Sequence, residues 1–264
     1  MISQQDNFAL KQPERILRLL SYNIQAGITT GSYHHYLTHS WKHILPFRRR
    51  EENLQRIASL IREYDIVGLQ EVDGGSLRSN YVNQVEHLAK NAHFPFWYQQ
   101  LNRNLGRLAQ HSNGFLSRYR PKAITEHKLP GLIPGRGAIV ARFGKDSNPL
   151  VLIILHLALS KRAQYRQLDH VCEMASDYQN VILMGDLNCP SRALEDHPSV
   201  RQADLYEPLV GLNTFPSWQP KRNLDHILVT PSLAVSGFSV LDYSGSDHLP
   251  ISIDINLPNE LELG

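Results

Sequence analysis

The sequence contains little that would support a disulfide-linked or membrane-spanning protein. It has only two cysteines, Cys172 and Cys189, and we expect both to be free, buried thiols because no export signal is apparent. No apolar run approaches the roughly 18 residues of a membrane-spanning helix, and residues 1–14 are polar and lack the apolar core of a signal peptide. These absences predict a cytoplasmic protein. The alternative is a protein exported by a system that does not use an N-terminal signal.

Neither sign of charge dominates the sequence. Lys and Arg number 27 against 25 Asp and Glu, so the pI near 8.5 does not by itself indicate a nucleic-acid partner. A long basic stripe and an internal repeat of short period are both missing. At 264 residues and 42% hydrophobic content, we expect one monomeric domain over residues 16–257, with a flexible arm at 1–15 and a tail at 258–264.

The stretch 181–190, VILMGDLNCP, indicates a buried strand that delivers polar side chains at its end. Four apolar residues precede Gly185 and a polar turn. Asp186 and Asn188 are spaced i and i+2, so an extended backbone would point both to the same side. The alternative interpretation is a strand-to-loop turn in which the two side chains make local turn bonds.

The same arrangement recurs along the chain. Short apolar runs that read as strands end in, or begin after, a polar residue, and these residues are Asn23, Glu71, His156, Asp186 and the pair Asp247-His248. A single polar strand end is commonplace. Carboxylates and imidazoles are rarely placed near a core unless they are paired or bind metal, so a shared site explains the whole set more economically.

The residue types in this set favour a hard divalent cation. The carboxylates of Glu71 and Asp247 and the amides of Asn23 and Asn188 supply oxygen ligands, which suit Mg²⁺ or Mn²⁺ rather than Zn²⁺. Magnesium that is held by few protein ligands usually awaits a phosphate. The pattern therefore predicts a metal-dependent reaction at phosphorus.

The histidines and Asp186 can supply the remaining chemistry of such a reaction. They can orient a water molecule, accept its proton and neutralise charge on the phosphorus. A histidine beside an aspartate is held in one tautomer and its protonated form is stabilised. Asp225 and Asp247 are both candidates for the partner of His248, and their spacing does not decide between them.

Seven motifs in order resemble the endonuclease/exonuclease/phosphatase superfamily, which includes deoxyribonuclease I, AP endonucleases, neutral sphingomyelinases and inositol-phosphate phosphatases. The motifs are SYNIQ, LQEVD, NGFLSR, LHLAL, GDLN, LDHI and GSDHLPI, and they span the chain from about Leu19 to Ile255. The resemblance implies an α/β fold: a four-layer sandwich of two mixed β-sheets packed face to face, with helices outside and the site at one end.

The resemblance also implies roles for individual residues. Glu71 looks like the principal metal ligand, with Asn23 beside it and Asp247 as a further carboxylate on the metal side. Asp186 and Asn188 resemble the residues that orient the attacking water and the phosphate.

The other roles concern the histidines and two weaker matches. His248 resembles the base or phosphate-contacting histidine, with Asp225 as its partner. His156 matches the deoxyribonuclease I and sphingomyelinase branches, whereas AP endonucleases tend to lack a histidine there. Asn113 and Arg136 match less closely, as a site-side amide and a phosphate contact, and a surface salt bridge is the alternative for Arg136.

An insertion at residues 25–50 follows the first strand and is expected to overhang the site. Its aromatic and basic residues could form a substrate lid, or the segment could be a surface loop anchored by its aromatics. These residues are Tyr33, Tyr36, Trp41 and Arg48 to Arg50. His35, His39 and His43 could bind adventitious metal if they were helical. Trp218 either faces the site or packs in a turn.

The sequence therefore predicts a Mg²⁺- or Mn²⁺-dependent phosphoesterase, and a phosphodiesterase in particular. Its substrate would be a nucleic acid or a phospholipid or small phosphodiester, although no hydrophobic hairpin of a secreted sphingomyelinase is recognisable. An inositol-phosphate type phosphomonoesterase is one alternative, and it would be expected to carry more basic loops. A non-catalytic binding protein that kept the fold is the other, and it predicts the loss of a main site residue, none of which is missing.

Overall fold

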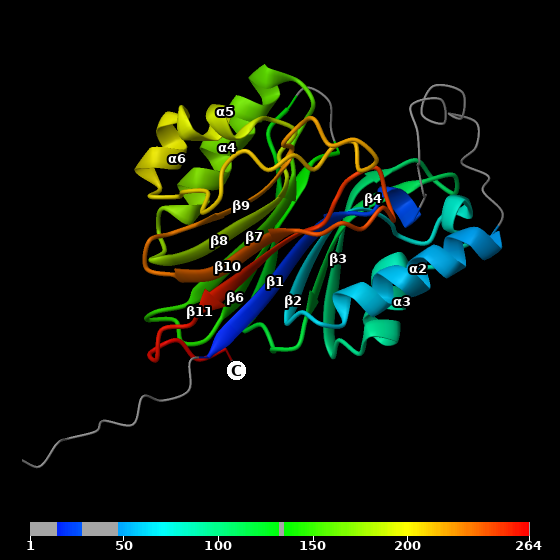
Figure 1. Ribbon diagram of the computed structural model, residues 1–264, viewed down its shortest axis with the longest axis horizontal. Coiled ribbons are helices and arrows are strands. Elements are labelled where there is room, and N and C mark those ends of the chain that lie inside the picture. Colours follow the sequence, from blue (N-terminus) through cyan, green and yellow to red (C-terminus); the bar gives the residue numbers. More distant parts are fainter. Residues whose placement is uncertain (1–14, 28–46, 132–134, 264) are drawn as a thin grey trace, which may run out of the picture.

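The structure, a computed structural model, describes residues 15–27, 47–131 and 135–263, and within them two mixed β-sheets carry the fold (Figure 1). The six-stranded sheet consists, in spatial order, of β10 (Ala234–Val240), β11 (Ile251–Asn256), β1 (Ile16–Asn23), β2 (Ile66–Asp73), β4 (Gln110–Ser117) and β3 (Phe96–Asn104). The five-stranded sheet consists of β5 (Ala123–Lys128), β6 (Gly137–Phe143), β7 (Leu150–His156), β8 (Asn180–Asp186) and β9 (Asp225–Val229).

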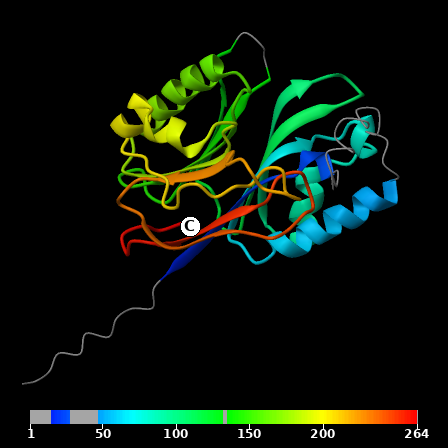
Figure 2. The ribbon, with the colours of Figure 1, turned by 45° about the horizontal axis from the view of Figure 1, so that its top comes forward.

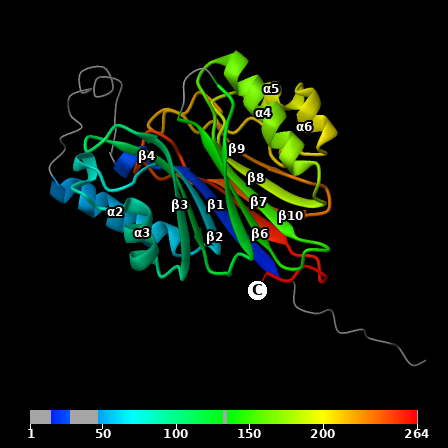
Figure 3. The same ribbon diagram turned by 180° about the vertical axis from the view of Figure 1, so that it is seen from behind.

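Helices cover the outer face of each sheet, as the view from behind shows (Figure 3). The helices on the six-stranded sheet are α2 (Phe47–Ile61) and α3 (Gln84–Ala92), and those on the five-stranded sheet are α4 (Lys161–Ala175), α5 (Ser191–Glu195) and α6 (Pro198–Gln202). Two short 3-10 turns, η1 (Gln25–Gly27) and η2 (Leu77–Ser79), complete the described elements. In the described part of the chain, no helix is long and apolar enough to cross a membrane.

Alternation along the strands creates three apolar layers. Leu17 and Leu19 of β1 point into the core between the sheets, whereas Leu20 and Tyr22 face α2 and α3. In the five-stranded sheet, Ile154 belongs to the central core while its neighbours on β7 pack toward α4. Strands buried on both faces explain the continuous apolar runs of the sequence. The expected four-layer α/β sandwich is confirmed.

Strand direction brings the polar strand ends together. β1 runs parallel to β2, and β7 runs parallel to β8, with His156 directly beside Asp186. β9 is antiparallel to β8 and begins at the site end, so Asp225 is the register partner of Asp186. One end of the sandwich therefore collects the end residues of strands from both sheets.

Some elements differ from the sequence-based expectation. β5 was not expected, because its residues AITEHK are mostly polar and it is an edge strand with little burial. β10 starts at Ala234, although the apolar and aromatic pattern of the sequence predicts a strand only over residues 238–243, and its pairing contains a register shift between Val235 and Gly237. α5 lies in a stretch that was expected to be irregular. None of these elements supplies a predicted site residue.

The predicted lid falls mostly outside the described residues. Residues 1–14 of the predicted arm and the loop residues Tyr33, His35, Tyr36, His39, Trp41 and His43 lie there. Of the predicted segment 25–50, the described residues at its end belong to α2, which begins at Phe47 and includes Arg49 and Arg50. Arg50 is buried, and it is therefore not part of an exposed basic lid.

Both cysteines are free and buried, as expected. Burial raises the pKa of the Cys172 and Cys189 thiols to about 12, with a smaller contribution from nearby carboxylates. Neither thiol is therefore a nucleophile at neutral pH.

Candidate active site

Asp186, the last residue of β8, lies at the centre of the site. Its side chain is 2% exposed, and its Oδ2 accepts a hydrogen bond of 3.0 Å from Asn23 Nδ2. The Nε2 atoms of His156 and His248 lie 3.3 Å and 3.8 Å from the same oxygen. One carboxylate oxygen therefore joins Asn23 of the six-stranded sheet to His156 of the five-stranded sheet and to a histidine that precedes β11.

Asn188 occupies a turn rather than an extension of β8. The strand ends at Asp186, and Asn188 has a left-handed backbone with φ of 53°. Its backbone N–H donates to Asp186 Oδ1 at 3.0 Å, and its Nδ2 donates to the Leu157 carbonyl at 3.0 Å. The extended-backbone prediction for this residue is therefore wrong, and the local turn bonds of the alternative interpretation are present. These bonds orient Asp186 and tie its loop to the end of β7.

The partner of His248 is Asp225. His248 Nδ1 and Asp225 Oδ2 are 2.8 Å apart, and Thr214 Oγ1 donates to the same carboxylate oxygen at 2.5 Å. The Phe215 ring packs against the imidazole, with ring centroids 5.0 Å apart. Burial alone would lower the pKa of His248, but Asp225 and Asp186 raise it well above its ordinary value. His248 is therefore an imidazolium at neutral pH.

His156 has the opposite charge state. It is buried at the end of β7, and burial lowers its pKa well below the ordinary value. The positive charges of Arg136 and His248 lower it further. Asp186 is therefore flanked by a neutral imidazole and a charged one, which can act as a proton acceptor and a proton donor respectively.

Glu71 and Asp247 add two carboxylates to the same end of the sandwich. Glu71 has φ of 55° and lies where the β2–β4 register shifts between Leu69 and Val72, a bulge that redirects its side chain. Burial raises the pKa of Asp247 to about 6, opposed by His248 and supported by the charge of Glu71. Burial likewise raises the pKa of Asp186 to about 7, with Asp225 and Glu71 acting in the same direction and His248 against them.

The donor set fits a divalent cation. Ligand atoms of Asp186, Asp225 and His248 all lie within 4.8 Å of one another, and the two carboxylates are the oxygen donors of this group, because His248 is protonated. Glu71 and Asp247 add negative charge nearby. Among the described residues, the Glu71 carboxylate takes part in no hydrogen bond or ion pair, and Asp225 Oδ1 is buried without a partner. Several acids crowded into a buried space repel one another unless a cation joins them, and oxygen donors suit Mg²⁺ or Mn²⁺.

Asn113 and Arg136 lie where β4 and β6 of the two sheets meet. Asn113 Nδ2 donates to the Gly137 carbonyl at 3.0 Å, while its buried Oδ1 has no partner within the described chain. Arg136 is half-buried; burial lowers its pKa, and the charges of Glu71 and Asp186 oppose that shift. In the described part of the structure Arg136 forms no ion pair, so the salt-bridge alternative is not what is observed. Trp218 is half-buried, one residue after Ser217, whose N–H donates to the Asp247 carbonyl.

Sequence reasoning missed a buried pair beneath the site. His226 Nδ1 lies 2.8 Å from Glu207 Oε1, and its Nε2 lies 2.7 Å from the Cys189 carbonyl. Each ring nitrogen lies within hydrogen-bond distance of an oxygen atom, so the ring links Glu207 and the Cys189 carbonyl, in the loop after Asp186, to β9. The LDHI motif contains His226, but no sequence signal connects it with Glu207.

A second missed feature is the hydrogen-bonded turn that follows Glu71. The buried Asp73 carboxylate accepts from the N–H and hydroxyl of Ser76, from the Ser79 hydroxyl and from Arg78 Nε at 2.9 Å. Burial by itself raises its pKa, but these partners outweigh burial and lower the pKa of Asp73 to about 2. The turn is therefore fixed next to the candidate metal ligand.

Replacing Asp73 by asparagine should lower the free energy of unfolding at pH 7 by about 2 kcal/mol, the value that corresponds to the depressed pKa. Because the folded pKa lies below the unfolded one, this stability is present above about pH 4 and is lost as the pH falls toward 2. Urea unfolding at several pH values measures it. The exposed Asp146 provides the control, and an equal loss in Asp146→Asn would contradict the explanation.

Replacing Asp225 by asparagine should reduce kcat for a chromogenic phosphodiester by roughly 10²-fold with little change in KM. The amide would remove the charge that keeps His248 protonated and would present an N–H to its Nδ1. Steady-state kinetics on bis-p-nitrophenyl phosphate measures the effect. Asp254→Asn, on β11 outside the site, serves as the control, and a kcat for Asp225→Asn close to wild type would rule out the His248–Asp225 pair as a functional unit.

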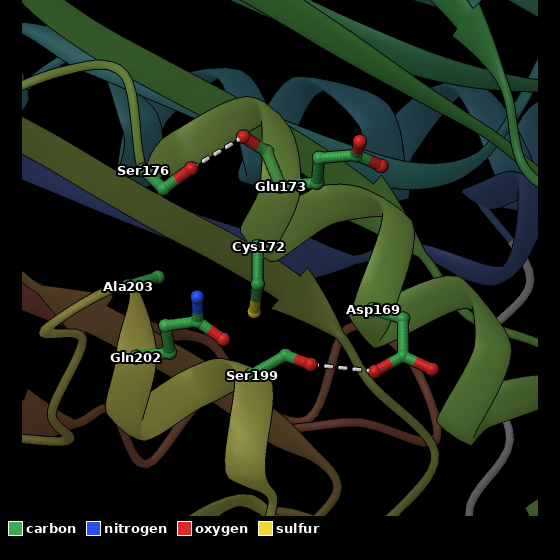
Figure 4. Close-up of a pocket in the computed structure, with 7 residues that line it drawn as sticks. All are labelled: Asp169, Cys172, Glu173, Ser176, Ser199, Gln202 and Ala203. Atoms are coloured by element: carbon green, nitrogen blue, oxygen red, sulfur yellow. Dashed lines mark hydrogen bonds between the residues drawn. The ribbon is translucent and has the colours of Figure 1, made fainter.

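The described structure also has a hollow of about 260 Å³ between α4 and α6 (Figure 4). It is lined by Cys172 and Asp169, among others, and Ser199 Oγ donates to Asp169 Oδ1 at 2.6 Å. The hollow lies within the helical layer, whereas Asp186 lies at the end of the strands. It is therefore separate from the candidate active site.

Comparisons with known proteins identify the family and the fold of this chain. The sequence model described as "Endonuclease/Exonuclease/phosphatase family" matches residues 20–248. A comparison with curated protein sequences finds no match. Among solved structures, the endonuclease/exonuclease/phosphatase from Beutenbergia cavernae superimposes with a TM-score of 0.70 at 20% identity, covering 92% of this chain and 72% of that one.

Two further solved structures, a phosphatase and a protein complexed with DNA, also superimpose on this chain. The mannosyl-6-phosphatase of Bacteroides thetaiotaomicron gives a TM-score of 0.63 at 18% identity, covering 90% of this chain and 99% of that one. The D. rerio TDP2 structure, complexed with a single-strand DNA product, gives 0.66 at 16% identity, covering 92% and 99%. At such identities the likeness shows the fold alone.

Proposed function

Because the chain belongs to the endonuclease/exonuclease/phosphatase family, we propose that it is a divalent-metal-dependent phosphodiesterase that hydrolyses its substrate by attack of water on phosphorus. The observation that carries the proposal is the position of Asp186. Its Oδ2 lies within 3.0–3.8 Å of Asn23, His156 and His248, so one carboxylate connects the proposed metal side with both imidazoles.

Glu71, Asp247 and Asn23 would hold the cation, Mg²⁺ or Mn²⁺. Asp225 and His248 are already bonded to each other, which leaves the Glu71 carboxylate as the acid most available for a metal. When bound, the cation would polarise a phosphoryl oxygen as a Lewis acid.

The protein's own residues supply the proton transfers and the orientation. Asp186 orients the attacking water and accepts its proton, since burial raises its pKa to about 7. His248, held charged by Asp225, donates a hydrogen bond to a phosphate oxygen or to the leaving group. Asn113 and Arg136 bind the non-bridging oxygens, and Asn188 holds Asp186 in place.

A diester fits the site better than a monoester. A phosphomonoester carries about one more negative charge near neutral pH than a diester. Among the described residues, Arg136 is the arginine near Glu71 and Asp186. The negative charges of these and neighbouring carboxylates offset its positive charge, so the site favours the substrate that carries less negative charge. The structurally similar proteins include a phosphatase and a DNA-bound protein, so the fold by itself does not choose.

The test is hydrolysis of bis-p-nitrophenyl phosphate beside p-nitrophenyl phosphate, each with Mg²⁺, Mn²⁺ or EDTA. We expect faster cleavage of the diester, and none in EDTA. Faster cleavage of the monoester would support the phosphatase alternative. Metal binding without turnover on either compound, or on DNA, RNA and phospholipid, would support a binding protein that has kept the fold.

A further inference from the structure

Two adjoining segments at the site end expose a cluster of large apolar side chains. They are residues 74–83, which follow Glu71 and Asp73, and residues 101–110, which form the tip of the β3–β4 hairpin; we call them together the hairpin rim. The exposed apolar residues on it are Leu77, Tyr81, Leu101, Leu105 and Leu108, and Leu108 is 69% exposed. Single exposed leucines are ordinary, but four exposed leucines and an exposed tyrosine on two hydrogen-bonded segments need an explanation.

Backbone hydrogen bonds display these side chains in fixed positions. Leu77 N–H donates to the Arg107 carbonyl at 2.7 Å, which joins the two segments, and Leu105 N–H donates to the Ala109 carbonyl at 2.9 Å across the turn. Gly106 has φ of 65°, the left-handed conformation that favours glycine. Figure 2 shows this hairpin projecting beside η2 at the right of the molecule. Leu105 and Leu108 therefore lie on a turn whose backbone conformation is fixed by hydrogen bonds, and Leu77 is tied to it by another.

All the charged residues of the hairpin rim are positive. Residues 74–83 and 101–110 contain three arginines, Arg78, Arg103 and Arg107, and no Asp or Glu. Arg78 is paired with Asp73, whereas Arg103 and Arg107 form no ion pair with any described residue. Exposed leucines interleaved with unpaired arginines suit an anionic lipid surface, where apolar side chains enter the interface and cations meet the headgroups.

We propose that the hairpin rim docks this protein onto the surface of an anionic lipid bilayer. A single-stranded nucleic acid would instead be expected to meet several stacking aromatics, and Tyr81 is the one aromatic residue of these segments. The sequence does not mark the hairpin as hydrophobic, because its leucines are separated by polar residues and only the folded turn displays them together.

Docking there would turn the site toward the bilayer. The hairpin rim lies between Glu71 of β2 and Asn113 of β4 along the chain. Leu159, in the loop that follows His156 of the other sheet, is 77% exposed. Docking itself is independent of catalysis. That the hydrolysed phosphodiester would belong to a lipid headgroup rests on the function proposed above.

Vesicle co-sedimentation of the full chain tests the docking. We expect binding to phosphatidylcholine vesicles that contain phosphatidylglycerol, and much less binding to phosphatidylcholine alone. The double variant Leu105→Ser/Leu108→Ser and the single variant Arg107→Ala should each weaken binding about tenfold or more, and added salt should weaken wild-type binding. Ile16→Ser and Arg120→Ala, exposed residues at the opposite end of β1 and β4, should bind like wild type.

Several outcomes would overturn the proposal. They are the absence of vesicle binding, equal binding to neutral vesicles, equal loss in the control variants, or binding of single-stranded DNA that depends on Arg107 but not on the leucines. The catalytically impaired Asp186→Asn protein should still bind vesicles. The leucine double variant should still hydrolyse soluble bis-p-nitrophenyl phosphate, so failure of docking and failure of the proposed function are separable.

Discussion

Asp186→Asn should lower kcat for bis-p-nitrophenyl phosphate by about 10³–10⁴-fold while the protein remains folded. An amide cannot accept a proton from water, and it also removes the charge that stabilises protonated His248 3.8 Å away. The shape of the side chain is kept, so KM should change little. Steady-state kinetics at saturating metal, with circular dichroism to verify folding, measures the effect.

The same substitution should stabilise the metal-free protein at alkaline pH. The folded pKa of Asp186 is raised to about 7, above its ordinary value of 3.8. The folded state therefore binds more protons between these values, and stability falls as the pH rises from about 4 to about 7. In EDTA at pH 8, asparagine should raise Tm, by about 2–4 °C for each kcal/mol recovered.

A matched control is Asp169→Asn, in the hollow between α4 and α6, which should change neither activity nor the pH dependence of stability in this way. Activity of Asp186→Asn within tenfold of wild type would remove Asp186 from the reaction. A lower Tm of Asp186→Asn in EDTA at pH 8 would show that burial of the ionised Asp186 carboxylate does not destabilise the folded protein.

Glu71→Gln should weaken Mn²⁺ binding and reduce turnover by roughly 10³-fold at limiting metal, since a bound cation contributes several kcal/mol to such reactions. Glutamine keeps the length of the side chain and one oxygen donor but loses the negative charge. Raising the metal concentration should recover part of the activity, because the loss lies in affinity. Isothermal titration with Mn²⁺ and kinetics at a series of metal concentrations measure the two effects separately.

Glu86→Gln, on the exposed face of α3 where Glu86 pairs with Lys90, is the control for loss of a glutamate charge. It should bind Mn²⁺ like wild type. Unchanged metal affinity in Glu71→Gln would exclude Glu71 as a principal ligand and would move the metal toward the carboxylates of Asp186 and Asp225.

Much of the fold and of the candidate site follows from local sequence. The apolar runs before Glu71, His156 and Asp186 read as buried strands, and the structure confirms all three. His156 and Asp186 meet because β7 and β8 are parallel neighbours that end at the same edge, whereas Glu71 lies at the bulge within β2, which continues to Asp73. The motif resemblance added the four-layer arrangement, which strand patterns alone do not specify.

What the sequence could not supply are contacts between distant segments. Spacing alone does not choose between Asp225 and Asp247 as the partner of His248; the motif resemblance points to Asp225, and the contact itself depends on β9 lying beside β8, a pairing that no local pattern encodes. The Glu207–His226 pair likewise joins a loop to a strand. Asn188 was placed on an extended backbone because the spacing i, i+2 does not reveal that β8 ends at Asp186 and that the chain then turns.

The most direct test of the account is a Mn²⁺ titration in which metal binding, by electron paramagnetic resonance, and hydrolysis of bis-p-nitrophenyl phosphate are followed in parallel. We expect the Kd for the activating ion to equal the concentration that gives half-maximal turnover, and both to shift together in Glu71→Gln. Turnover in the presence of EDTA, or full metal occupancy without any hydrolysis of phosphodiesters, would contradict it.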